Sequence, residues 1–191
     1  MDTDEVLRAA RADPYISRFL VGVYSLNTLP KQLETNATYI LNLSPDWSSG
    51  SHWTALSTLF TSRVEDTQHP SIFFFNSFGL PPPYSIKESL RSISEDRVYY
   101  SDVKVQHFLT RSCGFITLHF LALVSRGFSP MDILLRHFFP SDREPFKNEI
   151  LIQPVITELA GLKKRPILVS PSAIKKKNRK PKRNKKENTA T

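Results

Sequence analysis

Apolar residues recur along the first part of the chain with two periods, that of helices and that of strands. A helix is predicted over residues 2–12, where Val6, Leu7 and Ala10 share one face and Pro14 ends the run. Apolar segments bounded by loops rich in Ser, Asp, Gly and Pro predict three strands, at 38–43, 52–60 and 71–78. A helix over 87–95 and an alternating strand over 98–105 follow.

The segment 113–125, CGFITLHFLALVS, is apolar nearly all round, which is typical of a helix buried in the middle of a domain. Ser112 is its predicted N-cap. A second helix is predicted from Ser129 to about residue 139, and a further helix after residue 141 is broken by Pro154. Strands with segregated helices predict an α+β fold, in which a central mixed β-sheet packs against the buried helix.

Charge divides the chain into two parts. Residues 163–191 contain twelve Lys or Arg and one Glu, a net of +11, so the rest of the chain, with fourteen basic and seventeen acidic residues, has a net of −3. Dense like charge repels itself and stays disordered until it meets an anion. We therefore predict a folded domain over residues 1–161 and a disordered basic tail over residues 162–191.

The single cysteine, Cys113, excludes an internal disulfide and is typical of a reducing compartment. The acidic start of the chain lacks the features of a signal peptide, and no stretch reaches the roughly 18 consecutive apolar residues of a membrane span. We expect a soluble protein inside a cell.

A lone cysteine is ordinarily a buried structural residue. Cys113, however, falls on the first turn of the predicted buried helix, where unpaired backbone N–H groups and the helix dipole favour a thiolate. A thiolate is the reactive form of cysteine, and its formation requires a base. The interpretation of Cys113 as a nucleophile therefore depends on the histidines.

The chain has five histidines that could serve as this base. His119 and His137 lie in apolar helical segments, where packing is the simpler interpretation, and His69 lies in a polar loop before a proline. His107 is close to the cysteine in sequence and remains a rival. His52 opens a predicted strand directly after SSGS, so its side chain can project from the sheet edge into a cleft.

The motifs that surround these residues occur in a particular order. SHWTAL (51–56) precedes FFFNSFG (73–79), and Gln106 lies seven positions before Cys-Gly (113–114). In this order they resemble the adenovirus-type cysteine endopeptidases, the adenain family, within the wider group of ubiquitin-like-protein proteases. FLVGVYSLNTLP looks like the N-terminal strand of that family, so the resemblance covers about residues 15 to 139. It implies a papain-like arrangement, in which the buried helix starts at the catalytic cysteine.

The resemblance also implies a role for each matching residue. Cys113 is the nucleophile, and His52 is the general base that takes its proton and later protonates the leaving amine. Asn76 orients His52 by accepting the Nδ1–H of its ring. Gln106 donates its side-chain amide to the developing oxyanion, together with the backbone N–H of Cys113. Trp53 is expected to pack beside the imidazole.

The chain departs from the family's pattern at three points, one of which is the weak match of the region after residue 139. Asn76 stands where the family has Glu or Asp, so the charge that stabilises an imidazolium is missing and lower activity is expected. Adenovirus enzymes can hold a peptide cofactor through a second cysteine, which this chain lacks.

The function predicted from these features is that of a thiol protease. We expect a cysteine endopeptidase that cuts viral or transposon-like capsid or core precursors at small, Gly-containing sites during virion maturation. The sequence offers neither zinc-ligand spacing nor a Gly-rich phosphate loop, and no cofactor is required for the chemistry. DNA and an activating peptide are the expected stimulators, as the resemblance implies.

The basic tail is expected to bind DNA and to serve as a nuclear address, which places a monomeric protein in the host nucleus and in the virion. Its candidate phosphate contacts are the following basic residues: Lys175, Lys176, Lys177, Arg179, Lys180, Lys182 and Arg183. A tail that serves only solubility is the alternative.

Two other functions remain open for the whole chain. The first is an isopeptidase or deconjugase that acts on ubiquitin-like proteins ending in Gly-Gly, because the fold would be shared. The second is a basic virion protein that binds nucleic acid and whose domain has lost its activity.

Overall fold

The computed structural model describes residues 1–59, 71–94, 97–140, 144 and 146–153. Among these residues, five strands form one sheet whose spatial order follows the sequence: β1 (Leu20–Ser25), β2 (Thr38–Asn42), β3 (Trp53–Ser57), β4 (Ile72–Phe75) and β5 (Val98–Tyr100). The middle strand β3 is antiparallel to both of its neighbours, β2 and β4, whereas β1 pairs with β2 and β5 with β4 in parallel. The sheet is therefore mixed, as the sequence predicted.

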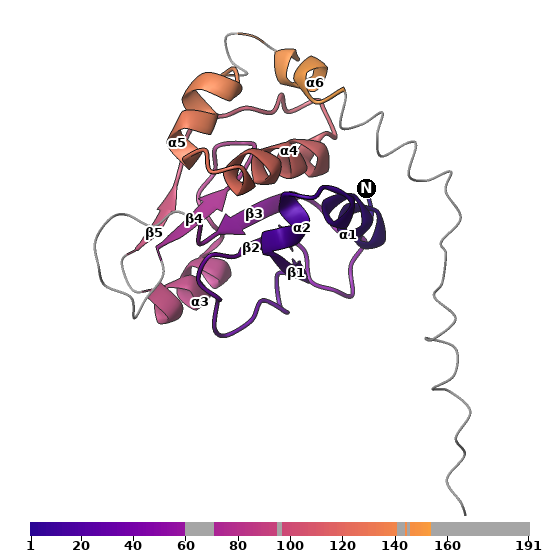
Figure 1. Ribbon diagram of the computed structural model, residues 1–191. Coiled ribbons are helices and arrows are strands. Elements are labelled where there is room, and N and C mark those ends of the chain that lie inside the picture. The colour runs from indigo at the N-terminus through magenta and orange to yellow at the C-terminus, as the bar shows by residue number, and fades with distance from the viewer. Residues whose placement is uncertain (60–70, 95–96, 141–143, 145, 154–191) are drawn as a thin grey trace, which may run out of the picture.

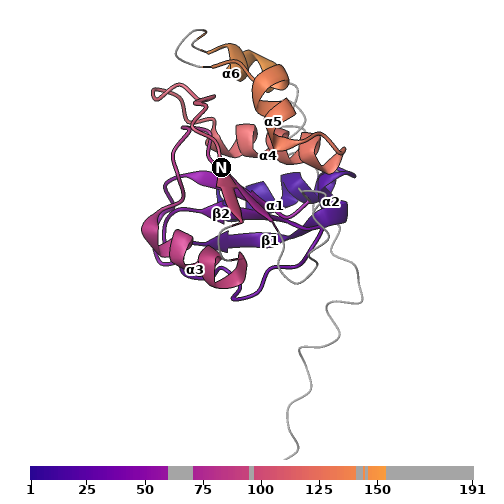
Figure 2. The ribbon, with the colours of Figure 1, turned by 90° about the vertical axis from the view of Figure 1, so that its left-hand side faces the viewer.

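Helices cover both faces of this sheet. In chain order they are α1 (Thr3–Ala12), α2 (Ile16–Phe19), α3 (Tyr84–Ser94), α4 (Cys113–Ser125), α5 (Pro130–Asp132), the π-helical turn η1 (Ile133–His137) and α6 (Lys147–Leu151). Figures 1 and 2 show α4 on one side of the sheet, with α5 and α6 beyond it, and α3 on the opposite side. The predicted α+β fold with a buried central helix is confirmed.

Alternate residues of the central strands build two hydrophobic cores. On the α4 side, Phe75 of β4 stacks on Phe120 of α4, with ring centroids 4.1 Å apart, and Ala55 of β3 joins the same cluster. On the α3 side, Phe74 packs with Leu90. Because successive strand residues point to opposite faces and both faces are covered, β2, β3 and β4 are buried along their whole length.

The N-terminal helix begins as its sequence predicts. The side chain of Asp2 accepts a hydrogen bond from the backbone of Glu5, and the Glu5 carboxylate accepts one from the backbone of Asp2, which is a capping box. Val6, Ala9 and Ala10 are buried, and α1 packs on β1 and α4. This packing carries Met1 to the start of α4, beside the predicted nucleophile.

The strand predicted over 98–105 is too long. β5 ends at Tyr100, because β4 pairs with it over only three residues before the chain turns away at Asn76. Gln106 therefore does not end a strand; it lies in the irregular segment after β5.

The helices differ from expectation at four points. The helix predicted from residue 87 begins three residues earlier, at Tyr84. Ser112 is at the N-cap of α4, but its side chain makes no capping bond. The helix predicted from Ser129 to residue 139 begins with the expected cap and turns into the π-helical η1, which ends at His137. The short helix α2, at Ile16–Phe19, was not predicted. Predictions that fall on residues 60, 69, 95, 141–143 and 154–191, the basic tail included, lie outside the described residues.

Candidate active site

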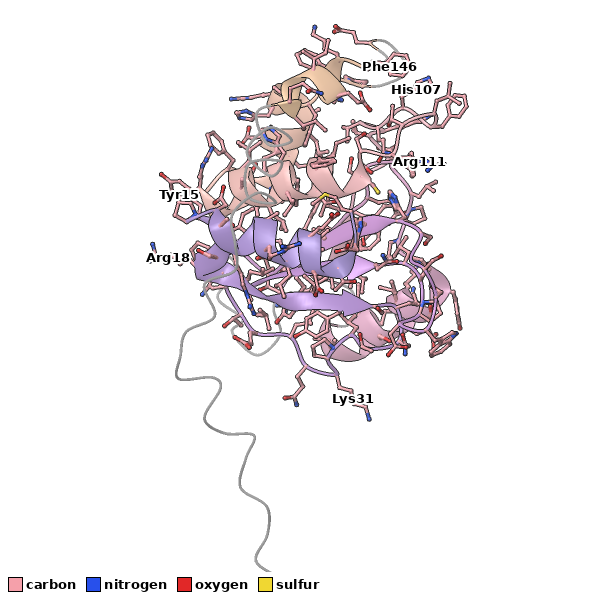
Figure 3. All side chains as sticks on the ribbon, turned by 90° about the vertical axis from the view of Figure 1, so that its right-hand side faces the viewer. Tyr15, Arg18, Lys31, His107, Arg111 and Phe146 are labelled. Atoms are coloured by element: carbon pink, nitrogen blue, oxygen red, sulfur yellow. The ribbon has the colours of Figure 1, made fainter. Side chains whose placement is uncertain are left out.

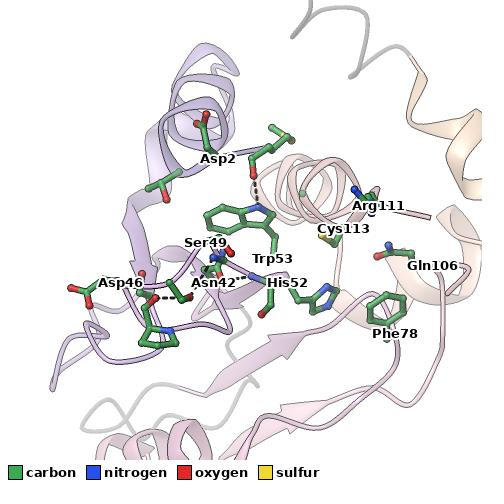
Figure 4. Close-up of a pocket in the computed structure, with 18 of the residues that line it drawn as sticks. Asp2, Asn42, Asp46, Ser49, His52, Trp53, Phe78, Gln106, Arg111 and Cys113 are labelled. Carbon is green, nitrogen blue, oxygen red and sulfur yellow. Dashed lines mark hydrogen bonds between the residues drawn. The ribbon is translucent and has the colours of Figure 1, made fainter. Parts of the chain in front are cut away.

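The predicted site residues meet at one pocket of about 590 Å³ (Figure 4). His52, Gln106 and Cys113 all line it, although they come from the residue just before β3, the segment after β5 and the start of α4. Asn76 lies directly after β4 and contacts His52. The structure thus brings together all four residues that the sequence singled out.

The nucleophile candidate is fixed by contacts between α4 and β3. One turn after Cys113, the hydroxyl of Thr117 donates a hydrogen bond to the carbonyl of Trp53, at 3.1 Å. A Cβ atom at Gly114 would lie 2.9 Å from the sulfur of Met1 and 3.2 Å from a ring carbon of Trp53, so glycine permits this close approach. The half-buried, free thiol of Cys113 is thereby held at the wall of the pocket, close to the strand that follows His52.

The hydrogen bonds of Asn76 fix the tautomer of His52. Nε2 of His52 lies 2.8 Å from Oδ1 of Asn76, and the same oxygen accepts the backbone N–H of Phe78 at 3.0 Å. A backbone N–H can only donate, so the atom facing Phe78 must be the amide oxygen, and His52 must then donate from Nε2. Nδ1 is left unprotonated. The prediction that Asn76 accepts from Nδ1 was wrong, because the ring presents Nε2 to it.

The surroundings of His52 keep its ring neutral. Burial lowers the pKa of His52 below its usual value of 6.5, and the hydrogen bond to Asn76 raises it only in part. The ring stacks on Phe78, with centroids 4.6 Å apart, whereas Trp53 donates its Nε1–H to the carbonyl of Met1. A neutral imidazole with one unprotonated nitrogen is suited to act as a base at neutral pH.

The side chain of Gln106 is buried and fixed in one orientation. Its Nε2 donates to the carbonyl of Thr110 at 3.0 Å, and its Oε1 accepts the hydroxyl of Ser77 at 2.6 Å. A carbonyl oxygen only accepts, so the atom of the Gln106 amide that faces the carbonyl of Thr110 must be the nitrogen. A primary amide has two N–H protons, so the second proton of Nε2 can serve an oxyanion.

A tight turn after β4 explains how Gln106 reaches the pocket. The backbone N–H groups of Val105 and Gln106 both donate to the carbonyl of Ser77, each at 2.9 Å. Gly79 has φ of 67°, and a Cβ atom there would lie 2.5 Å from the carbonyl oxygen of Asp102, so only glycine lets the chain pass this closely. The turn at Asn76–Gly79 therefore positions the segment after β5.

Sequence reasoning missed the roles of Ser77 and Phe78. Ser77 orients the amide of Gln106, and Phe78 both donates to Asn76 and stacks on His52. Their signal was present in FFFNSFG, the motif that pointed to Asn76. A short turn can supply several contacts to one site because its consecutive residues lie within a few ångström of each other.

Of the other histidines that the structure describes, none lines the pocket. His107, the rival base, packs against the rings of Phe108 and Phe146. His119 meets Phe138 edge to face, which fits the packing role predicted for it.

No group of three metal-ligating side chains occurs among the described residues. Within the same part of the chain, no helix has the length and hydropathy to cross a membrane.

No protein-family model and no curated protein matches the chain. Two solved structures of ASFV pS273R protease are similar to it. One is 14% identical with a TM-score of 0.46, over 74% of this chain and 62% of that chain. The selenomethionine crystal structure is 21% identical with a TM-score of 0.34, over 57% of this chain and 42% of that chain. The chain spans less than two thirds of the length of either solved chain of that protease.

Proposed function

We propose that the protein is a cysteine endopeptidase with Cys113 as nucleophile. The observation that carries this proposal is the hydrogen bond of 2.8 Å between His52 and Asn76, at a pocket that Cys113 and Gln106 also line. A nucleophile, a base and a residue that orients the base are the parts that acyl transfer by cysteine requires.

The first half of the reaction forms an acyl-enzyme. Nδ1 of His52 takes the proton of the Cys113 thiol, and the sulfur attacks the scissile carbonyl carbon. The oxyanion that develops receives the second N–H of Gln106 and the backbone N–H of Cys113, which has no acceptor inside α4 because it is in the first turn. When the intermediate collapses, the C–N bond breaks and His52 returns the proton to the leaving amine.

The second half restores the enzyme. His52 takes a proton from water, and the hydroxide oxygen attacks the thioester carbon. The C–S bond then breaks, and the thiol of Cys113 regains its proton. Asn76 keeps Nε2–H in place throughout, so the ring acts through Nδ1 in both halves.

The substrate class follows from the resemblance to the adenain family. The proposed substrates are capsid or core precursors, cleaved at small, Gly-containing sites in extended segments. We also propose that the basic tail binds DNA, which brings the enzyme and precursors together in the nucleus and the virion, and that an activating peptide adds to the stimulation.

The test is turnover by the purified protein. Wild-type protein is expected to cleave precursor peptides that contain Gly sites, and Cys113→Ala, which changes only one sulfur atom, is expected to have no activity. Equal cleavage by the two proteins, or cleavage by neither, would refute the proposal. A parallel assay uses fusions in which a ubiquitin-like protein is joined to a second protein after its Gly-Gly end. If these fusions are cleaved and the precursor peptides are not, the protein is a deconjugase.

A further inference from the structure

Helix α6 contacts the segment that carries Gln106, although the two lie about forty residues apart in the chain. We define residues 105–112 as the oxyanion segment, because Gln106 lies near its start and Cys113 follows its end. Three residues at the start of α6 contact this segment, namely Phe146, Asn148 and Glu149. None of them was a candidate from the sequence.

Asn148 attaches α6 to the beginning of the oxyanion segment. Its side chain is 1% exposed, and its amide nitrogen donates to the carbonyl of Val105 at 2.7 Å and to that of Phe139 at 2.6 Å. Its oxygen accepts the N–H of Phe139 at 2.9 Å. The amide thus joins three chain segments, and the removal of such a buried amide is expected to destabilise the region.

Phe146 adds a contact in the middle of the segment. Its backbone has φ of 68°, which is unusual for a residue with a side chain, and its ring lies 4.5 Å from that of His107 (Figure 3). The ring of Phe146 is therefore a second contact between α6 and the oxyanion segment.

Glu149 contacts the end of the segment. Its Oε1 lies within hydrogen-bonding distance of the hydroxyls of Thr110, at 2.9 Å, and Ser112, at 3.2 Å. The single proton of the Thr110 hydroxyl is shared between this carboxylate and the carbonyl of His107, which lies at 2.8 Å. The Ser112 hydroxyl faces this carboxylate and makes no capping bond at the start of α4. The backbone carbonyl of Thr110 in turn accepts the amide of Gln106. A continuous chain of contacts therefore runs from Glu149 through Thr110 to Gln106.

We propose that Glu149 is a positioning residue, which holds Thr110 and thereby aims the amide of Gln106 at the oxyanion. This inference rests on the proposed endopeptidase function and adds a residue to it. Thr110 is held by its hydroxyl, and its carbonyl decides where the Gln106 amide points. An oxyanion donor must lie close to hydrogen-bonding distance of the transition state, so a small displacement of Thr110 weakens catalysis.

The first test compares Glu149→Ala with Glu144→Ala, which removes an equal charge whose carboxylate contacts Lys147. Glu149→Ala is expected to lower kcat by about 10- to 100-fold with little change in KM, because the lost interaction acts in the transition state. Glu149→Gln retains an acceptor oxygen and is expected to keep most of the activity. Glu144→Ala is expected to behave as wild type.

The second test decides whether Glu149 acts through Gln106. In a Gln106→Ala background, the further change Glu149→Ala is expected to lower kcat less than threefold, because the amide it positions is already absent. Alkylation of Cys113 by iodoacetamide needs no oxyanion donor and is expected to be unchanged in Glu149→Ala. The proposal is overturned if the kcat losses of Gln106→Ala and Glu149→Ala add in full in the double variant. It is also overturned if Glu149→Ala lowers kcat and the rate of Cys113 alkylation by the same factor.

Hydrogen exchange separates this inference from the proposed function. Amides of the oxyanion segment are expected to exchange faster in Glu149→Ala than in wild type and Glu144→Ala, whether or not the protein cleaves peptides. If the wild-type protein does not hydrolyse peptides, only the proposed function is refuted. The exchange rates then still show whether Glu149 holds the oxyanion segment. Unchanged exchange in Glu149→Ala contradicts the positioning role.

Discussion

Asn76 offers the sharpest test of the proposed site, because one oxygen atom serves two donors. Its Oδ1 accepts from Nε2 of His52 at 2.8 Å and from the backbone of Phe78 at 3.0 Å, and its side chain is 5% exposed. Asn76→Ala removes this oxygen. A buried donor without an acceptor costs about 1–3 kcal/mol, so the free energy of unfolding is expected to fall by at least that amount.

The same change affects the tautomer of His52. Without Asn76, the Nδ1–H tautomer becomes populated, and in that form Nδ1 cannot take the thiol proton. We expect kcat to fall by about 10- to 100-fold, which corresponds to about 1.4–2.7 kcal/mol in the barrier. Asn76→Asp keeps an oxygen that can accept from both His52 and Phe78, and it adds a negative charge, so it is expected to retain or raise kcat.

The pH profile gives an independent readout with a definite sign. Burial lowers the pKa of His52, and the bond to Asn76 opposes this shift. His52 must be neutral to act as a base, so kcat/KM is expected to decline only below pH 6.5 in the wild type. Loss of the bond in Asn76→Ala lowers the pKa of His52 further and moves the decline to lower pH. A carboxylate in Asn76→Asp raises that pKa and moves the decline to higher pH.

Steady-state kinetics across the pH range, with thermal unfolding as a control for folding, measures these effects. An Asn76→Ala protein with wild-type kcat and an unchanged acid decline would remove Asn76 from the site. A decline that moves in the same direction in both variants would refute the assignment of the titrating group to His52.

Three further predictions concern the oxyanion donor, the base and the tail. Gln106→Ala is expected to lower kcat by about 10²- to 10³-fold in peptide hydrolysis, and an unaffected kcat would remove Gln106 from the oxyanion hole. Iodoacetamide is expected to label native protein once, and His52→Ala to slow that labelling; a thiol that reacts only after denaturation would make Cys113 a structural residue. For the tail, log affinity for duplex DNA is expected to fall with log salt at a slope of about −5, for about six phosphates. Replacement of the seven candidate basic residues by Gln in the full chain is expected to abolish this binding and DNA stimulation while short-peptide hydrolysis stays intact; an unchanged slope would place the contacts on the folded domain.

Local features of the fold were readable from the sequence because short-range interactions decide them. The start of α1 follows from the capping box of Asp2 and Glu5, which needs only four consecutive residues. Helix α4 spans Cys113–Ser125 as predicted, since a run that is apolar all round has to be buried wherever the chain places it. The strand at 98–105, in contrast, alternates over its whole length, but only three of its residues find a partner strand.

The candidate residues His52, Asn76, Gln106 and Cys113 were identified from residue types in a particular order, which a sequence records directly. Which ring nitrogen meets Asn76 was not recorded there. The Nε2 contact depends on where the end of β4 lies relative to the start of β3, and hence on the register of the sheet.

The supporting contacts were decided by tertiary structure alone. Glu149 lies in a short helix that carries no motif, and it meets Thr110 only because Asn148 attaches that helix to the backbone of Val105. Met1 reaches Trp53 only because α1 packs on β1 and α4. A sequence pattern indicates which residues share a face of one helix or strand. A contact between distant elements depends instead on the packing of every layer between them.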